Sequence, residues 1–480
     1  MSHTDVTASA PTASAPTATF GGAEAAGLLS QLRKIFASGR TRSIDWRHEQ
    51  LNGLLRLIAE REDELVAALG ADLGRAPFEA WAADLRATAR EIEDQRDHLA
   101  AWMKPEKCGV PWIFRPGRAE IVNEPLGVVL VIAPWNYPIQ LLLAPVAGAL
   151  AAGNVVVAKP SEVAPATSAA MARLLPLYVD SDAVVVVEGG VSETTALLEQ
   201  AWNHIFYTGN GAVGRIVATA AAAHLTPVTL ELGGKSPVII AKDANVKLAA
   251  SRVAFAKFLN AGQTCVAGDH VWVHRDVEQQ FLDALQKEIV QRYGKDPHTS
   301  KDYGRIINTG HARRLSGLLD GAGYEVAVGG QVDVEARYVA PTVLRDVAHD
   351  AAVMGQEIFG PILPVLAFDD LAEVTTTITA GDKPLALYVF SSSKETVAQV
   401  VAETSSGGVC VNDALNHLIV PSLPFGGVGE SGYGSYHGRA SFDTFSHRKS
   451  ILRRPSWAID PPLLNPPYSR WKRILVRRIF

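Results

Sequence analysis

Residues 27–103 show the spacing of apolar positions that is typical of amphipathic helices. The first set of apolar residues recurs at Leu51, Leu54, Leu55, Leu57 and Ile58. Charged residues fill the positions between them, and Ser43 and Asp45 precede the set as candidate N-caps. The pattern predicts a layer of helices that packs against a sheet.

From about residue 120 onward, short runs rich in Val and Ile alternate with Ala- and Leu-rich helical segments. Strands of a first unit are expected at Val128–Ile132, Val155–Ala158, Ala183–Val187, His204–Tyr207 and Val228–Leu230. A second unit begins near Ser236, with strands expected at Val238–Ile240, Val271–His274, Val326–Val328 and Ala386–Phe390. This alternation predicts an α/β fold with parallel sheets in two lobes, and ligands commonly bind between lobes.

One stretch, from Pro125 to Ala158, contains no charged residue and is long enough to span a bilayer. Several prolines interrupt it, however, and Gly153-Asn154 is typical of a turn. We therefore interpret it as a β-α-β segment buried on both faces of a parallel sheet.

The two ends of the chain differ in composition from the rest. Residues 1–26 are rich in Ala, Ser, Thr and Pro and lack the features of a signal peptide, which predicts a disordered tail. A proline-rich linker leads to Tyr468–Phe480, which carries five basic residues and no acidic one. This basic tail is either an anchor at a membrane surface or a solvated or subunit-docked segment, and the sequence leaves both open.

Composition narrows the function classes. Among 480 residues, 45 Lys and Arg against 50 Asp and Glu exclude a globally basic nucleic-acid binder. The only three cysteines, Cys108, Cys265 and Cys410, lie too far apart for a disulfide framework or a Cys-x-x-Cys zinc site. We expect no metal site, a reducing cytoplasmic compartment and a cysteine that acts singly.

Residues 209–214 form a Gly-x-Gly-x-x-Gly motif between an expected strand and an expected helix at Arg215–Ala223. This context favours dinucleotide binding, because glycines allow close approach of the backbone to a pyrophosphate. Glu231 lies 17 residues after Gly214 and is a candidate for the ribose hydroxyls. From its own Glu-Leu-Gly-Gly turn, Glu231 could equally be a general base or a turn carboxylate.

Two further residues could carry chemistry. Cys265 ends the tetrapeptide Gly-Gln-Thr-Cys, where it is either an exposed nucleophile or a small buried apolar residue. Asn136 lies in the loop Pro134–Pro138, where it could donate its amide to an oxyanion or simply form a turn.

Seven segments, in order, resemble the motifs of the aldehyde dehydrogenase superfamily. They are Pro134–Pro138; Ala158–Glu162; Phe206–Asn210 with Gly214; Thr226–Pro237; Asn260 with Gly262–Cys265; Glu357–Pro361; and Leu423–Gly429. The Thr226–Pro237 run, together with Ser435–Gly438 and Thr444–Arg448, resembles the class 3 branch, which includes fatty-aldehyde and aromatic-aldehyde dehydrogenases. The resemblance runs from about residue 27 to 453.

The resemblance implies a fold and its division along the chain. It implies a Rossmann-like cofactor domain, an α/β catalytic domain and a small β oligomerisation arm. The implied boundaries are 1–26 for the tail, 27–106 and 126–233 for the NAD-binding domain, 107–125 and 440–453 for the oligomerisation strands, 234–439 for the catalytic domain, and 454–480 for the linker and basic tail. Class 3 relatives are dimers, so a homodimer is expected.

The resemblance also implies the reaction, which is oxidation of an aldehyde to a carboxylic acid. Cys265 is implied as the nucleophile that forms a thiohemiacetal and then a thioester, Asn136 as an oxyanion donor, and Glu231 as the general base that activates water. Glu231 is then not the ribose ligand. Cys108 and Cys410 match no catalytic motif and are interpreted as structural.

The implied cofactor is NAD, with NADP as the alternative. The implied cofactor-binding residues are Trp135, Lys159, Glu162, Gly209, Asn210, Gly214, Leu232, Gly233, Glu357 and Phe359. Glu162 would bind the ribose hydroxyls and repel a 2′-phosphate, whereas Lys159 would attract one.

The aldehyde itself is not encoded in a motif. Pocket residues are expected to include Tyr137, Leu418, Ile419, Phe425 and His437, and their apolar character favours a bulky aliphatic or aromatic aldehyde. Two alternatives stay open at this point: an acylating or semialdehyde dehydrogenase of the same fold, and a non-enzymatic NAD-binding protein. Glu231 favours hydrolysis over acyl transfer to coenzyme A.

Overall fold

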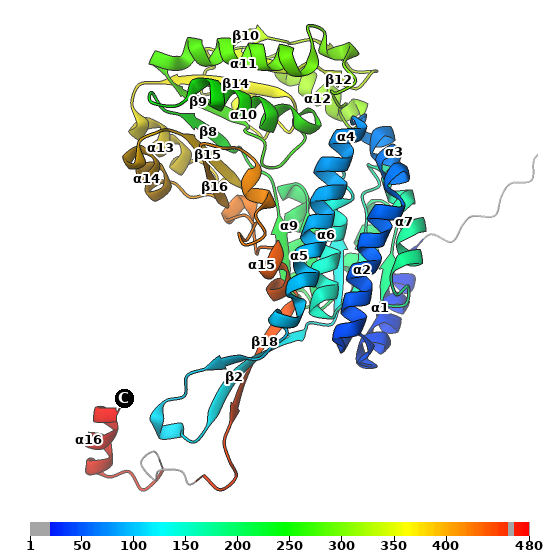
Figure 1. Cartoon of the computed structure of the whole chain (residues 1–480), viewed down its shortest axis with the longest axis vertical. Helices are drawn as coiled ribbons and strands as arrows, with labels where there is room; N and C mark the ends of the chain where they lie inside the picture. The colour runs from blue at the N-terminus through cyan, green and yellow to red at the C-terminus, as the bar shows by residue number, and fades with distance from the viewer. Residues whose placement is uncertain (1–19, 459–464, 480) are drawn as a thin grey trace, which may run out of the picture.

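The computed structural model describes residues 20–458 and 465–479. Two α/β units lie side by side, and a narrow β arm extends from them (Figure 1). The first unit is built on a six-stranded sheet, the second on a seven-stranded sheet, and the arm on three strands. This arrangement confirms the predicted α/β fold with parallel sheets.

The six-stranded sheet has the order β17-β7-β6-β3-β4-β5 and is parallel except for β17. Its strands are β3 (Val128–Ile132), β4 (Val155–Lys159), β5 (Val184–Val186), β6 (His204–Thr208), β7 (Val228–Glu231) and β17 (Gly432–Tyr433). Every residue of β3, β4 and β6 is buried, as expected for parallel strands covered on both faces. The short strand β17 comes from the chain segment that was assigned to the catalytic domain.

The first nine α-helices of the described part of the chain accompany this sheet. They are α1 (Gly22–Ala37), α2 (Ile44–Glu60), α3 (Glu62–Leu73), α4 (Pro77–Ala80), α5 (Ala87–Trp102), α6 (Gln140–Ala152), α7 (Pro165–Tyr178), α8 (Val191–Leu198) and α9 (Gly211–Ala222). The uncharged stretch folds as β3, α6 and β4, so its interpretation as buried β-α-β is confirmed. Among the described residues, no helix is both long and apolar enough to cross a bilayer.

The seven-stranded sheet has the order β10-β13-β14-β9-β8-β15-β16 and is parallel except between β10 and β13. Its strands are β8 (Pro237–Ile240), β9 (His270–His274), β10 (Glu325–Val328), β13 (Thr342–Arg345), β14 (Ile362–Phe368), β15 (Ala386–Phe390) and β16 (Gly408–Val411). The helices of this unit are α10 (Val246–Phe258), α11 (Glu278–Tyr293), α12 (Thr309–Leu319), α13 (Leu371–Ala380) and α14 (Lys394–Glu403). A later helix, α15 (Gly438–Thr444), packs instead against α5 and α6 of the first unit. A separate pair, β11 (Val332–Asp333) and β12 (Tyr338–Val339), is antiparallel.

The arm consists of β1 (Glu106–Cys108), β2 (Arg118–Pro125) and β18 (Ser446–Arg453). All eight residues of β18 pair antiparallel with β2, so these distant segments form one sheet. Figure 1 shows this sheet projecting away from both units, with α16 (Arg470–Ile479) near its far end.

Two boundaries differ from the sequence prediction. The prediction of a disordered tail is wrong for residues 22–26, because α1 begins at Gly22. The Glu24 carboxylate caps this helix by accepting from the Gly21 amide. Residues 1–19 of the predicted tail lie outside the described part. The late arm strand begins only at Ser446, since α15 occupies 438–444. Pro461 and Pro462 of the predicted linker also lie outside the described residues.

Candidate active site

The loop that carries Cys265 follows directly from α10. That helix ends at Phe258, and Asn260 and Ala261 then adopt left-handed backbone conformations with φ of 53° and 50°. Asparagine tolerates this region better than most residues, whereas an alanine there is strained. The reversal ends the helix and turns the chain toward Cys265, which is half-buried.

Asn136 and Tyr137 meet this loop from the other α/β unit, because they follow β3. The Asn136 side-chain amide donates to the carbonyl oxygen of Gln263 at 3.0 Å. The Tyr137 hydroxyl lies 2.8 Å from the Thr264 hydroxyl oxygen. The structure therefore brings Asn136 and Tyr137 next to the two residues that precede Cys265.

Cys265 lies in an unfavourable environment for a thiolate. Burial, the largest cause, acts together with the nearby carboxylates of Glu357 and Glu231 to raise the pKa of its thiol from 9.0 to about 12. Backbone amides of Cys265 and Val266 offset part of this effect. The electrostatic coupling places Glu231, Glu357 and Cys265 together, although 34 and 92 residues separate the two carboxylates from the cysteine in sequence.

Glu231 is buried without a hydrogen-bond partner. It ends β7, its residue is 2% exposed, and both carboxylate oxygens lack a protein partner. Burial raises its pKa well above the ordinary value. An unpartnered buried carboxyl is expensive, and such groups concentrate at functional sites.

The loop that carries Glu357 is fixed by an ion pair between Lys235 and Asp269. Lys235 also donates to the carbonyl oxygens of Val353 and Gln356, each at 2.9 Å, and Asp269 accepts from the Ile358 amide at 2.8 Å. These bonds hold the chain on both sides of Glu357.

Gly233 allows the Glu357 carboxylate to approach the backbone. A Cβ atom on Gly233 would lie 2.1 Å from Glu357 Oε2, which no side chain permits. Burial raises the pKa of Glu357 to about 8, and the Asp269 carboxylate raises it too. The structure thus brings together Gly233 and Glu357, both predicted from the resemblance to contact the cofactor.

Lys159 and Glu162 lie at the carboxyl end of β4, the edge at which open α/β sheets bind nucleotides. The Lys159 ammonium donates to Glu162 Oε2 at 2.9 Å and to the Pro160 carbonyl at 3.1 Å. The Lys159 side chain is 3% exposed and that of Glu162 is 46% exposed. At this edge of the sheet, the Glu162 carboxylate is therefore partly accessible to a ligand, whereas the Lys159 ammonium is buried and already paired.

The glycine motif begins a helix, as predicted, but earlier than expected. Helix α9 starts at Gly211, and Asn210 caps it by accepting from the Val213 amide at 3.0 Å. A Cβ atom on Gly214 would lie 2.9 Å from the Leu232 side chain, so the absence of a side chain lets α9 approach that residue. The start of the glycine motif lies beside the end of β7, because the Gly209 amide donates to the Glu231 carbonyl oxygen at 3.0 Å.

Trp135 and Phe359 meet across the two units. Their ring centroids lie 5.3 Å apart in an edge-to-face arrangement, and Trp135 also contacts His311 at 5.1 Å. Phe359 adopts a positive φ of 44° to reach this position. Nothing in the sequence singled out His311, whose partner is 176 residues away.

The predicted pocket residues occupy different environments. Phe425, His437 and Tyr137 are buried, Leu418 packs partly against the core, and Ile419 is 62% exposed. The Phe425 and Tyr436 backbones pair, and their rings lie 5.7 Å apart. His437 Nδ1 lies 3.5 Å from Glu91 Oε2, and burial lowers the pKa of this histidine.

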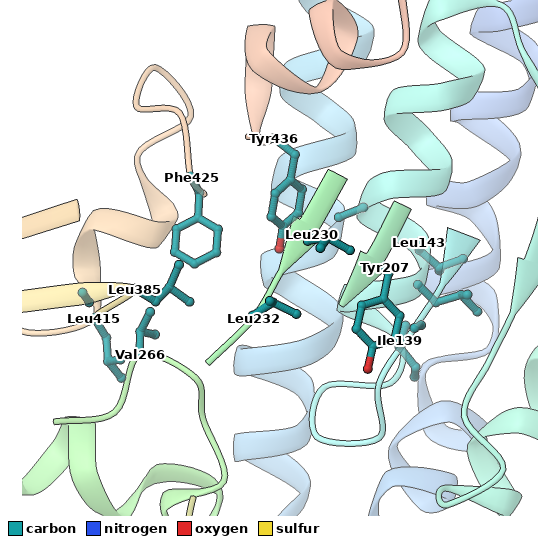
Figure 2. Packing of buried hydrophobic residues seen from close by; sticks show 14 of the residues in the cluster. Ile139, Leu143, Tyr207, Leu230, Leu232, Val266, Leu385, Leu415, Phe425 and Tyr436 are labelled. Carbon is teal, nitrogen blue, oxygen red and sulfur yellow. The ribbon is translucent and has the colours of Figure 1, made fainter. Parts of the chain in front are cut away.

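Figure 2 shows how apolar side chains surround this region. Val266, Leu385, Leu415 and Phe425 come from the unit of the seven-stranded sheet, while Leu230, Leu232, Tyr207, Ile139 and Leu143 come from the other unit. The Tyr436 side chain lies beside Leu230.

Sequence reasoning missed Tyr436 and Lys257. The pKa of Tyr436 is raised by burial and by Glu231 and Cys265, so its hydroxyl lies close to both. Lys257 is 1% exposed, and burial lowers its pKa to about 8 while Asp269 and Glu357 oppose this effect. Among the described residues, no cluster of three or more His, Cys, Asp or Glu could hold a metal ion.

Comparisons with known proteins identify relatives of this chain. The model of the aldehyde dehydrogenase family matches residues 6–451. Aldehyde dehydrogenase family 3 member H1 of Arabidopsis thaliana is 46% identical over 96% of both chains. The dimeric NADP-preferring aldehyde dehydrogenase of Rattus norvegicus is 46% identical over 88% of this chain and 93% of its own.

A solved structure supports the same conclusion at the level of the fold. The substrate-bound state of Staphylococcus aureus AldH superposes with a TM-score of 0.91 and 41% identity, over 94% of this chain and 99% of that chain. A family model that spans most of the chain, together with relatives near half identity, leaves no other family to consider. The chain belongs to the aldehyde dehydrogenase family.

Proposed function

We propose that this protein oxidises bulky apolar aldehydes, aliphatic or aromatic, to carboxylic acids with NAD or NADP, through a covalent thioester on Cys265. Membership of the family supports the reaction class. The observation that carries the proposal for this chain is the placement of the unpartnered Glu231 carboxyl within electrostatic reach of Cys265.

Cys265 is the proposed nucleophile. Its thiolate attacks the carbonyl carbon, a C–S bond forms, and the carbonyl oxygen becomes the oxyanion of a thiohemiacetal. The Asn136 amide has two N–H groups and spends one on Gln263, so the second can donate to that oxyanion. The Cys265 backbone amide is the second proposed donor.

Glu231 is the proposed general base for hydrolysis. Burial raises its pKa, so its carboxylate is a stronger base than an exposed glutamate and can take a proton from water. The resulting hydroxide attacks the thioester carbon, and the Cys265 thiolate leaves. When bound, the nicotinamide accepts the hydride that turns the thiohemiacetal into this thioester.

The residues at the sheet edge fit a dinucleotide. Glu357 and Gly233 form a tight cradle, and the half-exposed Glu162 offers a carboxylate to ribose hydroxyls. We propose that NAD is preferred, because Glu162 would repel a 2′-phosphate while the Lys159 charge is already paired. The rat relative named as NADP-preferring supports NADP as the second cofactor.

The proposed substrate class rests on the apolar side chains near Cys265. Tyr137 and Phe425 are buried aromatic residues, and Leu418 and Ile419 continue the apolar surface outward. A series of straight-chain aldehydes together with benzaldehyde derivatives tests this proposal. We expect kcat/KM to rise with apolar size; turnover confined to short, charged aldehydes would contradict it.

The same assay separates hydrolysis from acyl transfer. With Glu231 as the base, the product is the free acid, and coenzyme A leaves the rate unchanged. A requirement for coenzyme A, with an acyl thioester as product, would favour the acylating alternative instead.

We propose that the protein is a homodimer that pairs through its arm. The β1-β2-β18 sheet projects from the units, and β18 is its edge strand. The backbone groups on the free side of β18 are therefore available to pair with a second subunit. The rat relative is named as dimeric. Light scattering of the purified chain should give twice the monomer mass, and a monomer or a tetramer would contradict the proposal.

We also propose that the basic tail binds anionic membrane surfaces, so that a cytoplasmic protein is held peripherally. On α16, Trp471, Ile474 and Leu475 follow helical spacing and are 56%, 55% and 40% exposed. Arg470, Arg473 and Arg477 line a neighbouring face. Exposed apolar and cationic faces on one helix suit an anionic bilayer.

Liposome flotation tests the tail. The full chain should float with vesicles that contain phosphatidylserine, and a chain ending at Pro467 should not. Equal flotation of both chains, or no flotation of either, would overturn the proposal. Two charge reversals serve as a matched pair, Arg473→Glu on α16 and Arg313→Glu on α12. Both change the net charge of the protein equally, but only Arg473→Glu should weaken flotation.

A further inference from the structure

Arg75 is a buried cation that no sequence motif indicates. It lies in the connection between α3 and α4, just after Gly74 ends α3. Its side chain is 0% exposed. A buried cation is tolerated only when partners satisfy its donors, so the identity of those partners is informative.

The guanidinium of Arg75 is divided among three elements of the active site. Its Nε donates to Asn260 Oδ1 at 2.8 Å, and its Nη2 donates to the carbonyl oxygen of Asn136. Its plane lies over the ring of Tyr137, with 4.3 Å between the Arg75 Cζ atom and the ring centroid. One side chain therefore touches both loops that enclose Cys265.

The same atoms form a closed set of bonds around Asn136. The Asn136 carbonyl oxygen also accepts from Asn260 Nδ2 at 2.9 Å, and the same side-chain nitrogen donates to the Gln263 carbonyl oxygen at 3.1 Å. Gln263 O in turn accepts from the Asn136 side chain. Arg75 and Asn260 thus fix the Asn136 backbone, and Gln263 fixes one hydrogen of its side chain.

Acidic groups hold Arg75 from behind. Its Nη1 donates to Asp84 Oδ2 at 2.9 Å, and Glu79 Oε1 lies 3.8 Å from its Nε. Asp84 also accepts from the backbone amide of Gln140 at 2.5 Å, and Glu79 accepts from the backbone amide of Asn260 at 2.9 Å. Each carboxylate therefore joins Arg75 to one of the two loops.

We propose that Arg75 is a positioning residue for the oxyanion site: it clamps the Asn136 loop against the Asn260–Thr264 loop and so aims the Asn136 amide at the oxygen formed on attack by Cys265. This inference rests on the proposed role of Asn136. It requires a guanidinium, because a lysine is a single point charge and cannot serve Asn260, Asn136 and Asp84 at once.

A double-mutant cycle tests this role. We expect Arg75→Lys to lower kcat/KM by about tenfold or more in the wild-type background, chiefly through kcat, since small misplacements of reacting groups are costly. In the Asn136→Ala background the same change should cost less than about twofold, because there is no amide left to position. Affinity for NAD should not change.

Arg47→Lys is the matched control. Arg47 is also a buried arginine in this unit and donates to backbone carbonyls at Thr41 and Ala151, away from Cys265. Loss of activity in Arg47→Lys equal to that in Arg75→Lys would mean that only general stability is affected, and it would overturn the proposal. Equal fold-losses for Arg75→Lys in both backgrounds would overturn it as well.

A second variant keeps the test decisive if Arg75→Lys does not fold. Asn260→Gly removes the other donor to the Asn136 carbonyl, leaves Arg75 in place and suits the left-handed backbone at this position. It should show the same dependence on Asn136: a large loss alone and a small loss in combination. Full activity of Asn260→Gly, or losses that multiply with those of Asn136→Ala, would contradict the clamp. The wild-type protein is assayed alongside the variants. Turnover by the wild type shows that the proposed reaction occurs, so a result against the clamp can be told apart from a failure of the proposed function.

Discussion

The side-chain amide of Asn136 donates to the main-chain oxygen of Gln263 at 3.0 Å, and this bond joins the two α/β units at the loop that carries Cys265. Asn136 follows β3 of the six-stranded sheet, and Gln263 follows α10 of the other unit. The proposed reaction centre is therefore assembled only when the units are correctly docked. Changes at this contact should affect chemistry more than cofactor affinity.

The thiol of Cys265 should become more reactive when a neighbouring carboxylate is neutralised. Glu357 and then Glu231 raise the pKa of this thiol, so Glu357→Gln and Glu231→Gln should each lower it and speed alkylation of the apoenzyme by iodoacetamide at pH 8. The larger effect is expected for Glu357→Gln. Glu430→Gln, at an exposed ion pair with Arg215, is the control and should leave the rate unchanged. Slower alkylation in either active-site variant would contradict this electrostatic account.

Glu231→Gln should separate the two halves of the reaction. Without the base, the thioester still forms but hydrolyses slowly, and loss of a general base typically costs about 10²–10⁴-fold. We expect a burst of one NADH per subunit followed by little turnover, and an acyl adduct on Cys265 by intact-mass spectrometry. Normal steady-state turnover in this variant would assign the base to another residue.

Cofactor choice should respond to the charge at Glu162. Replacing Glu162 by Gln removes repulsion of a 2′-phosphate and releases Lys159 from its ion pair. We expect KM for NADP to fall by up to about fivefold, since an exposed charge pair contributes about 1 kcal/mol or less. KM for NAD should rise slightly, because a ribose acceptor is weakened. An unchanged ratio of the two KM values would remove Glu162 from the cofactor site.

Stability should depend on pH through Glu357. Burial raises its pKa from 4.5 to about 8, so the folded state retains a proton that the unfolded state releases between these values. Its contribution to the free energy of unfolding is fully present below pH 4.5 and is lost as the pH rises toward 8. Glu357→Gln should therefore raise Tm at pH 8.5 relative to wild type and change it little at pH 4.5. An equal shift at both pH values would contradict the raised pKa.

Local patterns predicted much of the fold. Strands such as Ala386–Phe390 and Val128–Ile132 match their predicted bounds, because a buried parallel strand is a short, continuous apolar run. β13, β14 and β16 were missed: Thr342–Arg345 is short and polar at its ends, and β14 contains Pro364. The first residues of α1 were missed because Ala and Gly there resemble the preceding tail.

Residues of the proposed site could be predicted where they lie in a recognisable motif. They could not be predicted where only the folded structure brings them close to the site. The resemblance assigned Cys265, Glu231 and Asn136, and the structure brings their loops together. Arg75 escaped notice because 61 residues separate it from Asn136 and 185 from Asn260. An arginine between two helices is normally a solvated residue, and only tertiary packing reveals its burial.

The most direct test of the central claim is the appearance of NADH with an apolar aldehyde, measured side by side for wild type, Cys265→Ala and Cys410→Ala. Cys410 is a half-buried cysteine on β16 and serves as the matched control. The account predicts turnover in wild type and in Cys410→Ala, and its loss in a folded Cys265→Ala. Turnover that survives in Cys265→Ala would contradict the covalent mechanism proposed here.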